Sequence, residues 1–288
     1  MSDAGDVRTI GVIGAGSIGK GVCADLVLHG MRVVLVDVAA QQLDEARDSI
    51  VQTVRFAPML RRDLPSMTRE EVLDALETST EIASVAGCEF VVENVVEDWD
   101  VKRDVYRALD AVAAPEARFG VNTSSIPIAR VAAETSRPDR VVGIHFMNPP
   151  YLKEAVEVVR GAGTSEETLG YVRDFLAALG KEGIVVDDFP GFVSNRISHL
   201  FFNEAVRVVE EQGVAPAIVD RLFKKCFGHA MGPLETADLI GLDTVALTLD
   251  SLHESYGDDR FACAGLLRDM VRAGKLGKKS GEGFYEYR

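Results

Sequence analysis

The sequence has few cysteines, and none of its four belongs to a CxxC pair. Cys23, Cys88, Cys226 and Cys263 are far apart and have mostly apolar neighbours. No group of histidine, cysteine and acidic residues has the spacing of a metal site, and no GxSxG motif marks a nucleophilic serine. The pattern favours reduced, buried thiols in a reducing compartment.

Long apolar runs and excess positive charge are also missing. No apolar run approaches the roughly 20 residues that span a bilayer, and Met1–Arg8 has no apolar signal core. With 45 acidic and 31 basic residues, the net charge is −14. Such a surface does not attract nucleic acid or an anionic membrane, so we expect neither as a partner. These absences predict a soluble, cytoplasmic protein.

The first half of the chain alternates β-branched runs with helical patterns. This alternation is typical of βαβ units, and it predicts a mostly parallel sheet covered on both faces. The strands are expected at Thr9–Ile13, Arg32–Val36, Phe90–Val95, Phe119–Asn122, Arg140–His145, Ala155–Val159 and Gly183–Val186.

A long helical segment interrupts this series. Residues Ala40–Thr78 are charged and helical in pattern, and they exceed the length of a simple crossover. We expect a helical hairpin, broken near Asp63-Leu64-Pro65, inserted into the first domain.

The character of the sequence changes at Asp188. Residues 1–188 are predicted to form the α/β domain, and residues 189–288 an all-helical domain. The first helix of the second domain should carry an apolar stripe at helical spacing, formed by Ile197, Phe201, Ala205 and Val208. Apolar stripes in such a domain are commonly buried against a second subunit, so we expect a homodimer.

The segment Gly14-Ala15-Gly16-Ser17-Ile18-Gly19 matches GxGxxG between an expected strand and an expected helix. Gly14 permits a tight turn, Gly16 lets a pyrophosphate approach the backbone, and Gly19 lets the helix pack closely. The helix start, including Ser17 and Ile18, offers free N–H groups to the phosphates. The pattern predicts a Rossmann-type dinucleotide site.

Asp37 ends the next strand, 18 residues after Gly19. A carboxylate at this position accepts hydrogen bonds from a ribose 2′-hydroxyl and repels a 2′-phosphate. No arginine follows it in Val38–Gln41 to bind such a phosphate. The expected cofactor is therefore NAD.

Oxidation of an alcohol by hydride transfer without a metal needs a base, and histidine suits neutral pH. His145 closes an expected strand, at the sheet edge where ligands of doubly wound folds bind. Glu157 lies among apolar residues of the next strand, where a lone carboxylate is costly unless it is paired. A His145–Glu157 pair explains both positions. The other four histidines favour structural roles: His29, His199, His229 and His253.

Two polar positions have alternative interpretations. Asn122-Thr123-Ser124-Ser125 ends another strand, where it could cap a helix over Ile128–Thr135, bind a ligand, or do both. Asn195 opens the long helix of the second domain, where it could be a helix-start residue or face an interdomain cleft.

Several motifs together resemble the L-3-hydroxyacyl-CoA dehydrogenase family over essentially the whole chain. They are Gly14–Gly19 with Asp37, Asn122–Ser125, His145–Pro149, Glu157, Pro190–Arg196, Met231–Pro233 and Lys278–Tyr285. The resemblance implies NAD-dependent oxidation of the 3-hydroxyl of a 3-hydroxyacyl thioester to the 3-oxo form.

The resemblance also implies roles for individual residues. His145 is the base and Glu157 its partner, while Ser124 and Asn195 hold the 3-oxygen and thioester region of the substrate. Asn148 is expected at the substrate as well. Glu97, Lys102 and Asn122 are expected at the cofactor, with Glu97 and Lys102 near the nicotinamide ribose. The helical insertion is expected to bind the CoA portion, through Arg55, Arg61 and Arg62.

The chain departs from the family pattern at Pro150-Tyr151-Leu152-Lys153-Glu154, where relatives have a mostly apolar run bordering the acyl pocket. If these side chains face the pocket, a short polar acyl unit is favoured over a long alkyl chain. The sequence is also similar to polyketide-pathway dehydrogenases that oxidise a glyceryl unit on an acyl carrier protein. A free hydroxy-acid (gulonate-type) dehydrogenase and a crystallin-like structural protein remain further alternatives.

Overall fold

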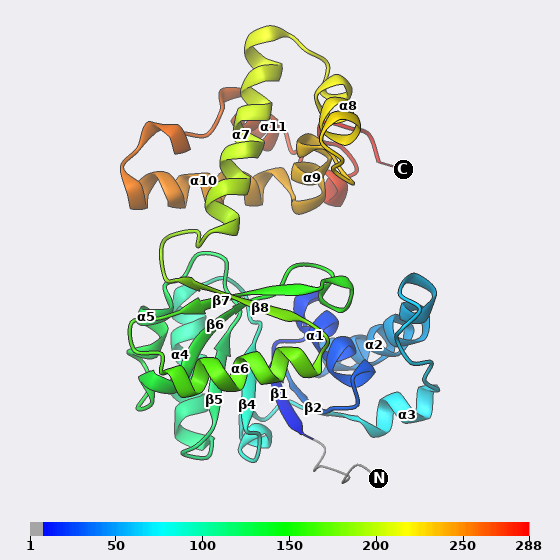
Figure 1. Cartoon of the computed structure of the whole chain (residues 1–288), viewed down its shortest axis with the longest axis vertical. Coiled ribbons are helices and arrows are strands. Elements are labelled where there is room, and N and C mark those ends of the chain that lie inside the picture. The colour runs from blue at the N-terminus through cyan, green and yellow to red at the C-terminus, as the bar shows by residue number, and fades with distance from the viewer. Residues whose placement is uncertain (1–7, 288) are drawn as a thin grey trace. The chain divides into compact units, whose positions relative to one another are not determined.

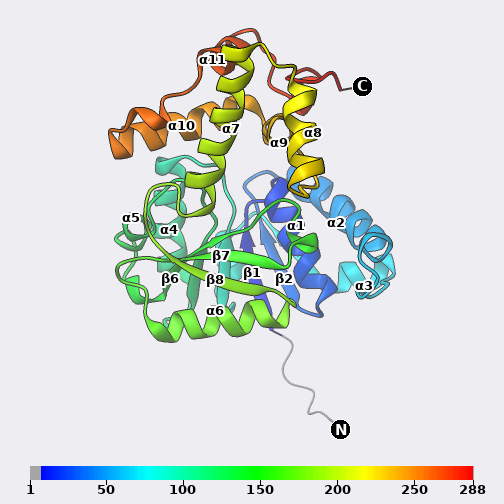
Figure 2. The ribbon, with the colours of Figure 1, turned by 45° about the horizontal axis from the view of Figure 1, so that its top comes forward.

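The computed structural model describes residues 8–287, and the chain divides into two compact units between Asp188 and Phe189. The first unit is a sheet flanked by helices, and the second consists of helices (Figures 1 and 2). In the described part of the chain, no helix is long and apolar enough to cross a membrane.

The first unit contains one eight-stranded sheet, in the order β3-β2-β1-β4-β5-β6-β7-β8. Every neighbouring pair is parallel except the antiparallel pair of β6 and β7. Chain order reverses between β1 and β4, which opens a crevice at the carboxyl ends of the strands. The predicted Rossmann-type sheet is thus confirmed. Its strands are β1 (Thr9–Ile13), β2 (Arg32–Val36), β3 (Leu76–Ser79), β4 (Phe90–Glu93), β5 (Arg118–Val121), β6 (Val141–His145), β7 (Ala155–Arg160) and β8 (Glu182–Asp187).

Helices cover both faces of the sheet, which is why the central strands are almost continuously apolar. Residues such as Ile10 and Val12 share one buried cluster with α1 (Ser17–Leu28), α2 (Ala40–Leu60) and α6 (Glu166–Ala178). On β5, Phe119 contacts Tyr106 of α4 (Trp99–Val112) edge to face, with ring centroids 6.0 Å apart.

The helical insertion is shorter than predicted. After α2 and the short helix α3 (Arg69–Asp74), residues Leu76–Ser79 form β3 rather than continuing the helical pattern to Thr78. This edge strand pairs with β2, and its outer residues Glu77, Thr78 and Ser79 are polar. Four mostly polar residues at an edge carry too little β-pattern to be recognised in the sequence.

The second unit contains α7 (Ser194–Gln212), α8 (Pro216–Cys226), α9 (Pro233–Ile240), α10 (Leu242–Tyr256) and α11 (Gly265–Arg272). Its core includes Phe202 and Val206 of α7 and Leu249 of α10. Of the predicted stripe on α7, Ala205 is buried and Phe201 and Val208 pack partly against the core, whereas Ile197 is 62% exposed.

Two buried carboxylates fasten the C-terminal segment to this helical core. Asp238 accepts hydrogen bonds from the main-chain N–H groups of Phe284 and Tyr285. Asp220 accepts from the Tyr285 hydroxyl (2.7 Å) and also from the first N–H groups of α9. The Lys278–Tyr285 motif therefore serves the packing of this unit.

Candidate active site

The turn after β1 is built for glycine at two positions. Gly14 has a φ of +95°, and a Cβ there would lie 2.6 Å from the main-chain oxygen of Asn94. A Cβ at Gly19 would lie 1.9 Å from the main-chain oxygen of Gly14. Only glycines allow α1 to begin this close to the strand.

Gly16 serves another purpose, because a Cβ there would meet nothing within 4 Å. Its backbone faces open space at the start of α1, where Ser17 and Ile18 form the first turn. Since Gly16 has no side chain to cap the helix, the first N–H groups can serve an anion. The turn therefore fits the pyrophosphate of a dinucleotide.

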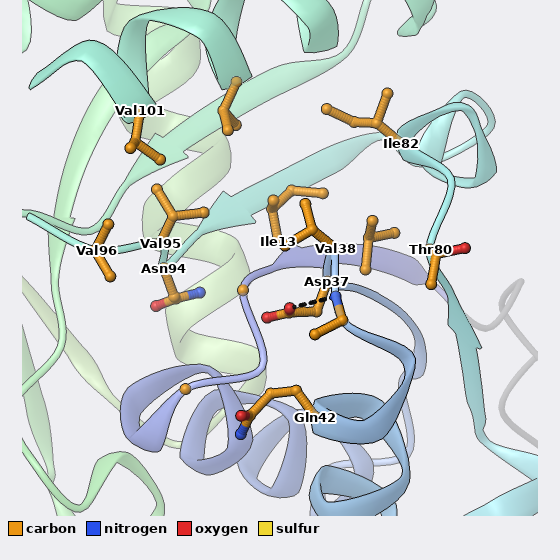
Figure 3. Close-up of a pocket in the computed structure, with 15 residues that line it drawn as sticks. Ile13, Asp37, Val38, Gln42, Thr80, Ile82, Asn94, Val95, Val96 and Val101 are labelled. Atoms are coloured by element: carbon orange, nitrogen blue, oxygen red, sulfur yellow. Dashed lines mark hydrogen bonds between the residues drawn. The ribbon is translucent and has the colours of Figure 1, made fainter. Parts of the chain in front are cut away.

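Asp37 follows β2 and binds the glycine-rich turn directly. Its Oδ2 accepts from the N–H of Ala15 (2.8 Å), and its Oδ1 accepts from the N–H of Ala39 (3.1 Å). The carboxylate borders a cavity of about 430 Å³ at the ends of β1, β2 and β4 (Figure 3). Aliphatic walls beside one carboxylate fit an adenosine with a free 2′-hydroxyl. The lining includes Asp37, Val38, Gln42, Ile82, Asn94 and Val101.

His145 and Glu157 form a close pair at the adjoining part of this edge. His145 is the last residue of β6, and Glu157 is its cross-strand partner on antiparallel β7. The imidazole Nδ1 lies 2.9 Å from Glu157 Oε2, and both side chains are more than 90% buried. Nε2 lies 3.2 Å from the hydroxyl of Ser124. The pairing accounts for a carboxylate in an otherwise apolar strand.

The loop after β5 is organised by Glu97. One oxygen, Oε1, accepts from the N–H of Ser124 (2.9 Å), the N–H and hydroxyl of Ser125 (both 3.0 Å), and the Thr123 hydroxyl (2.5 Å). Desolvation opposes ionisation of Glu97, but Lys102 and these donors outweigh it and lower its pKa.

This geometry changes the interpretation of the loop. Helix α5 (Ile128–Ala132) begins after Pro127 without a side-chain cap, so the predicted capping role of Asn122–Ser125 is wrong. The hydroxyls of Thr123 and Ser125 donate to Glu97 instead, and the Ser124 hydroxyl lies against His145. Asn122 donates to Asn94 Oδ1 (2.7 Å) and accepts from the N–H of Phe146 (3.2 Å), next to His145.

A buried ion pair supports the loop from below. Lys102 and Glu93 are both fully buried, and Lys102 Nζ lies 2.8 and 2.9 Å from the Glu93 oxygens. Nζ also donates to the main-chain oxygen of Asn122 (2.9 Å) and lies 3.6 Å from Glu97 Oε2. Burial raises the pKa of Glu93, and the Lys102 ammonium opposes that rise. Lys102 is thus buried under the loop that it supports, and its expected place near the nicotinamide ribose stays a prediction.

Comparison with known proteins identifies this arrangement. Residues 9–189 match the family model "3-hydroxyacyl-CoA dehydrogenase, NAD binding domain", and residues 191–287 match "3-hydroxyacyl-CoA dehydrogenase, C-terminal domain". The chain belongs to the 3-hydroxyacyl-CoA dehydrogenase family. It is an NAD-dependent oxidoreductase that acts on the CH–OH group of an acyl thioester, as the sequence predicted.

Individual relatives agree over nearly full length. A probable 3-hydroxybutyryl-CoA dehydrogenase of Deinococcus radiodurans is 41% identical, covering 96% of this chain and 99% of its own. One of Bacillus subtilis is 38% identical, with 98% of each chain covered. The crystal structure of (S)-3-hydroxybutyryl-CoA dehydrogenase from Ralstonia eutropha has a TM-score of 0.91 at 34% identity, covering 98% of this dehydrogenase and 100% of that chain.

The three arginines of the dehydrogenase that are predicted to bind the CoA portion differ in their surroundings. Arg55 and Arg62 are exposed near the end of α2, beside exposed Phe56, Met59 and Leu60. Arg61 instead forms an ion pair with Asp63 (2.8 Å) and donates to the main-chain oxygen of Tyr151 (3.4 Å). Its guanidinium is engaged within the fold, so it is a weaker candidate for an external phosphate.

The polar residues of the run Pro150–Glu154 do not line one pocket together. Pro150–Leu152 forms a 3-10 turn, and Tyr151 packs partly against the core that contains α1 and α2. Lys153 and Glu154 are exposed. The first unit thus gives no support to a polar acyl pocket built from these side chains.

Two predicted substrate residues lie on separate elements. Asn148 is exposed, in the segment that follows β6. Asn195 lies in the first turn of α7 in the second unit, where its main-chain oxygen accepts from His199 Nδ1 (2.9 Å). That hydrogen bond uses the main-chain oxygen of Asn195, so it does not show what the Asn195 side chain does.

Sequence reasoning missed Glu93 and gave Thr123 no role apart from its neighbours in the Asn122–Ser125 run. Thr123 is buried, and its hydroxyl also accepts from the N–H groups of Ser125 and Ile126. A signal for Glu93 was present, since it ends the apolar strand Phe90–Glu93 and Lys102 follows nine residues later.

Proposed function

We propose that His145 is the general base that removes the proton of the 3-hydroxyl, with Glu157 as its orienting partner. The observation that carries this proposal is the 2.9 Å contact between His145 Nδ1 and Glu157 Oε2. An ionised Glu157 can only accept a hydrogen bond, so it favours the tautomer with the proton on Nδ1. Nε2 then keeps its lone pair for the substrate.

The substrate hydroxyl would lie within reach of both Nε2 and the Ser124 hydroxyl. Ser124 can donate to the 3-oxygen while His145 takes the proton, and Glu157 stabilises the resulting imidazolium. When bound, NAD supplies the hydride acceptor. We assign Asn195 and Asn148 to the thioester end of the substrate, as the family resemblance implies, and Asn122 to the support of the cofactor site.

For the substrate, we propose a short-chain 3-hydroxyacyl-CoA, with 3-hydroxybutyryl-CoA as the reference compound. The names of the most similar relatives support this assignment. The exposed Arg55 and Arg62 near the end of α2 are suited to CoA phosphates, and the adjacent Phe56 and Met59 to an apolar contact. An acyl carrier protein, which is acidic, is the second candidate for the same surface.

The substrate assay compares 3-hydroxybutyryl-CoA, 3-hydroxyhexanoyl-CoA, a carrier-bound glyceryl unit and a free hydroxy acid, each with NAD. We expect the highest kcat/KM with 3-hydroxybutyryl-CoA, and an Arg55→Glu/Arg62→Glu variant should raise KM for CoA substrates and leave KM for the free hydroxy acid unchanged. Activity confined to the carrier-bound unit would support the second candidate. Turnover of the free acid alone would reject a thioester-dependent function.

We further propose that the dehydrogenase is a homodimer formed through the helical unit. Ile218, Leu222 and Phe227 of the α8 region are exposed by 54%, 54% and 70%. Apolar side chains of this size are usually covered when they cluster. Multi-angle light scattering at micromolar concentration should give twice the chain mass of 31.2 kDa, and Leu222→Glu/Phe227→Glu should shift it towards the monomer. A monomeric wild-type protein would contradict the proposal.

We also propose a cytoplasmic location. The four cysteines are free thiols, and burial raises the pKa of Cys23 and Cys88, which keeps them protonated and unreactive. Cys226 is exposed and Cys263 partly exposed, so the expectation of buried thiols is wrong for these two, but free thiols still suit a reducing compartment. Recovery of the activity in a membrane or secreted fraction would refute this assignment.

A further inference from the structure

The segment that joins the two strands of the dyad contains a tight turn held by a buried lysine. Lys181, which immediately precedes β8, has a fully buried side chain. Its Nζ donates to the main-chain oxygens of Pro150 (2.9 Å) and Lys153 (2.6 Å). One ammonium therefore binds a carbonyl group of the turn Pro150–Leu152 and the carbonyl group of the residue that follows it.

The same ammonium ties the turn to the cofactor-binding helix. Lys181 Nζ lies 3.1 Å from Oδ2 of Asp25, a residue of α1 that is 1% exposed. His29, at the end of α1, lies 3.4 Å from the other Asp25 oxygen, and its hydrogen bond with Asp25 raises its pKa. Besides these two contacts, neither oxygen of Asp25 has a hydrogen-bond partner among the described residues, so the ion pair is costly to bury and its place in the fold is specific.

Close packing adds a second restraint between the turn and α1. A Cβ on Gly21 of α1 would lie 2.6 Å from Cδ of Pro150. The turn thus rests on the helix at a position that tolerates no side chain. On the far side, Glu182 donates its N–H to the main-chain oxygen of Glu154 (2.8 Å), which fixes the start of β7.

We propose that the Lys181–Asp25 pair, together with the close packing of Pro150 on Gly21, is a positioning device for the catalytic dyad. It fixes the turn between β6 and β7, and with it the register that places Glu157 opposite His145. It also links the turn before Glu157 to α1, the helix whose N-terminus follows the glycine-rich loop. The inference rests on the proposed function of His145 and Glu157, because it concerns their spacing.

Gly21→Ala tests the inference, because its methyl group must displace the Pro150 ring; the higher helix propensity of alanine offsets part of the cost, and circular dichroism checks the fold. The methyl group should displace the turn and weaken the Glu157–His145 contact. We expect kcat to fall by about 10- to 100-fold, as for a misplacement of roughly 1 Å. The pH midpoint of the oxidation rate should also fall, because a weaker carboxylate contact favours imidazolium less. The affinity for NADH, measured by fluorescence, should change less than about threefold, roughly 0.7 kcal/mol.

Gly170→Ala is the matched control. Gly170 lies within helix α6, and a Cβ there would meet nothing within 4 Å, so kcat and the pH midpoint should remain those of the wild type. A folded Gly21→Ala variant with wild-type kcat and pH midpoint would overturn the inference.

Removing the ion pair is the second test. Asp25→Asn/Lys181→Met eliminates both buried charges together, whereas Asp25→Asn alone retains the donor to the turn. We expect the double variant, checked for folding by circular dichroism, to lose more kcat and to shift the pH midpoint further than the single variant. Equal kcat and pH midpoint in the two variants would count against Lys181.

His145→Gln in the same assay distinguishes a failure of the positioning inference from a failure of the base assignment. If it is inactive while Gly21→Ala behaves as wild type, the positioning inference fails and the base assignment stands. If it retains wild-type turnover, the base assignment itself fails.

Discussion

His145→Gln is expected to reduce kcat by about 10²–10⁴, the usual contribution of a positioned general base. Glutamine keeps a polar side chain of similar size but cannot take a proton from the substrate. The affinity for NADH should change little, because His145 lies outside the cavity that fits adenosine. Stopped-flow or steady-state kinetics with 3-hydroxybutyryl-CoA measures the effect, and circular dichroism checks the fold. Near-normal turnover in a folded variant would mean that another residue is the base.

Glu157→Gln provides the companion measurement. It keeps a hydrogen-bond acceptor near Nδ1 but removes the charge that favours imidazolium. The oxidation rate should rise with pH in both proteins, with the midpoint at lower pH in the variant, and kcat should fall. A midpoint at the wild-type pH would show that Glu157 does not act on the imidazole as a charge.

Lys102→Met should lower the free energy of unfolding by about 3–5 kcal/mol, the usual cost of leaving one member of a buried pair unpaired. Methionine has similar length but leaves the fully buried Glu93 without its cation. The double variant Glu93→Gln/Lys102→Met should be much less destabilised, because no buried charge remains. Urea denaturation at neutral pH measures both losses.

The pH dependence of this loss follows from the sign of the Glu93 shift. Burial raises the pKa of Glu93 in the folded protein, and Lys102 opposes the rise. Without Lys102 the folded-state pKa rises further, so the protonated carboxyl favours folding at low pH and the ionised form opposes it as the pH increases. The destabilisation should therefore shrink as the pH falls towards about 4.3, the ordinary value for glutamate.

Arg103→Met is the control on the same helix. Its guanidinium pairs with Asp100 and Asp104 at the surface, where such pairs contribute about 0–1 kcal/mol. A loss for Lys102→Met no larger than this control would show that the buried pair does not hold the Asn122–Ser125 loop.

The sequence by itself determined the class of the protein. Close backbone approach requires glycine at 14 and 19, and Gly16 leaves the start of the helix open to a phosphate, so the spacing of the three is visible without coordinates. The alternation of strands and helices predicted the sheet, because each element shows its own apolar period in the local sequence. Glu157 was recognisable because a carboxylate in an apolar strand must have a partner.

What the tertiary structure decided concerns contacts between segments far apart in the chain. Glu97 accepts from the hydroxyls of Thr123 and Ser125, for which the sequence left a helix cap and a ligand role as alternatives, and Arg61 pairs with Asp63 and donates to Tyr151. Lys102, which the family resemblance places near the nicotinamide ribose, is buried against Glu93 and Asn122. A local pattern specifies which groups need partners, but only packing determines which partner lies close enough to satisfy them.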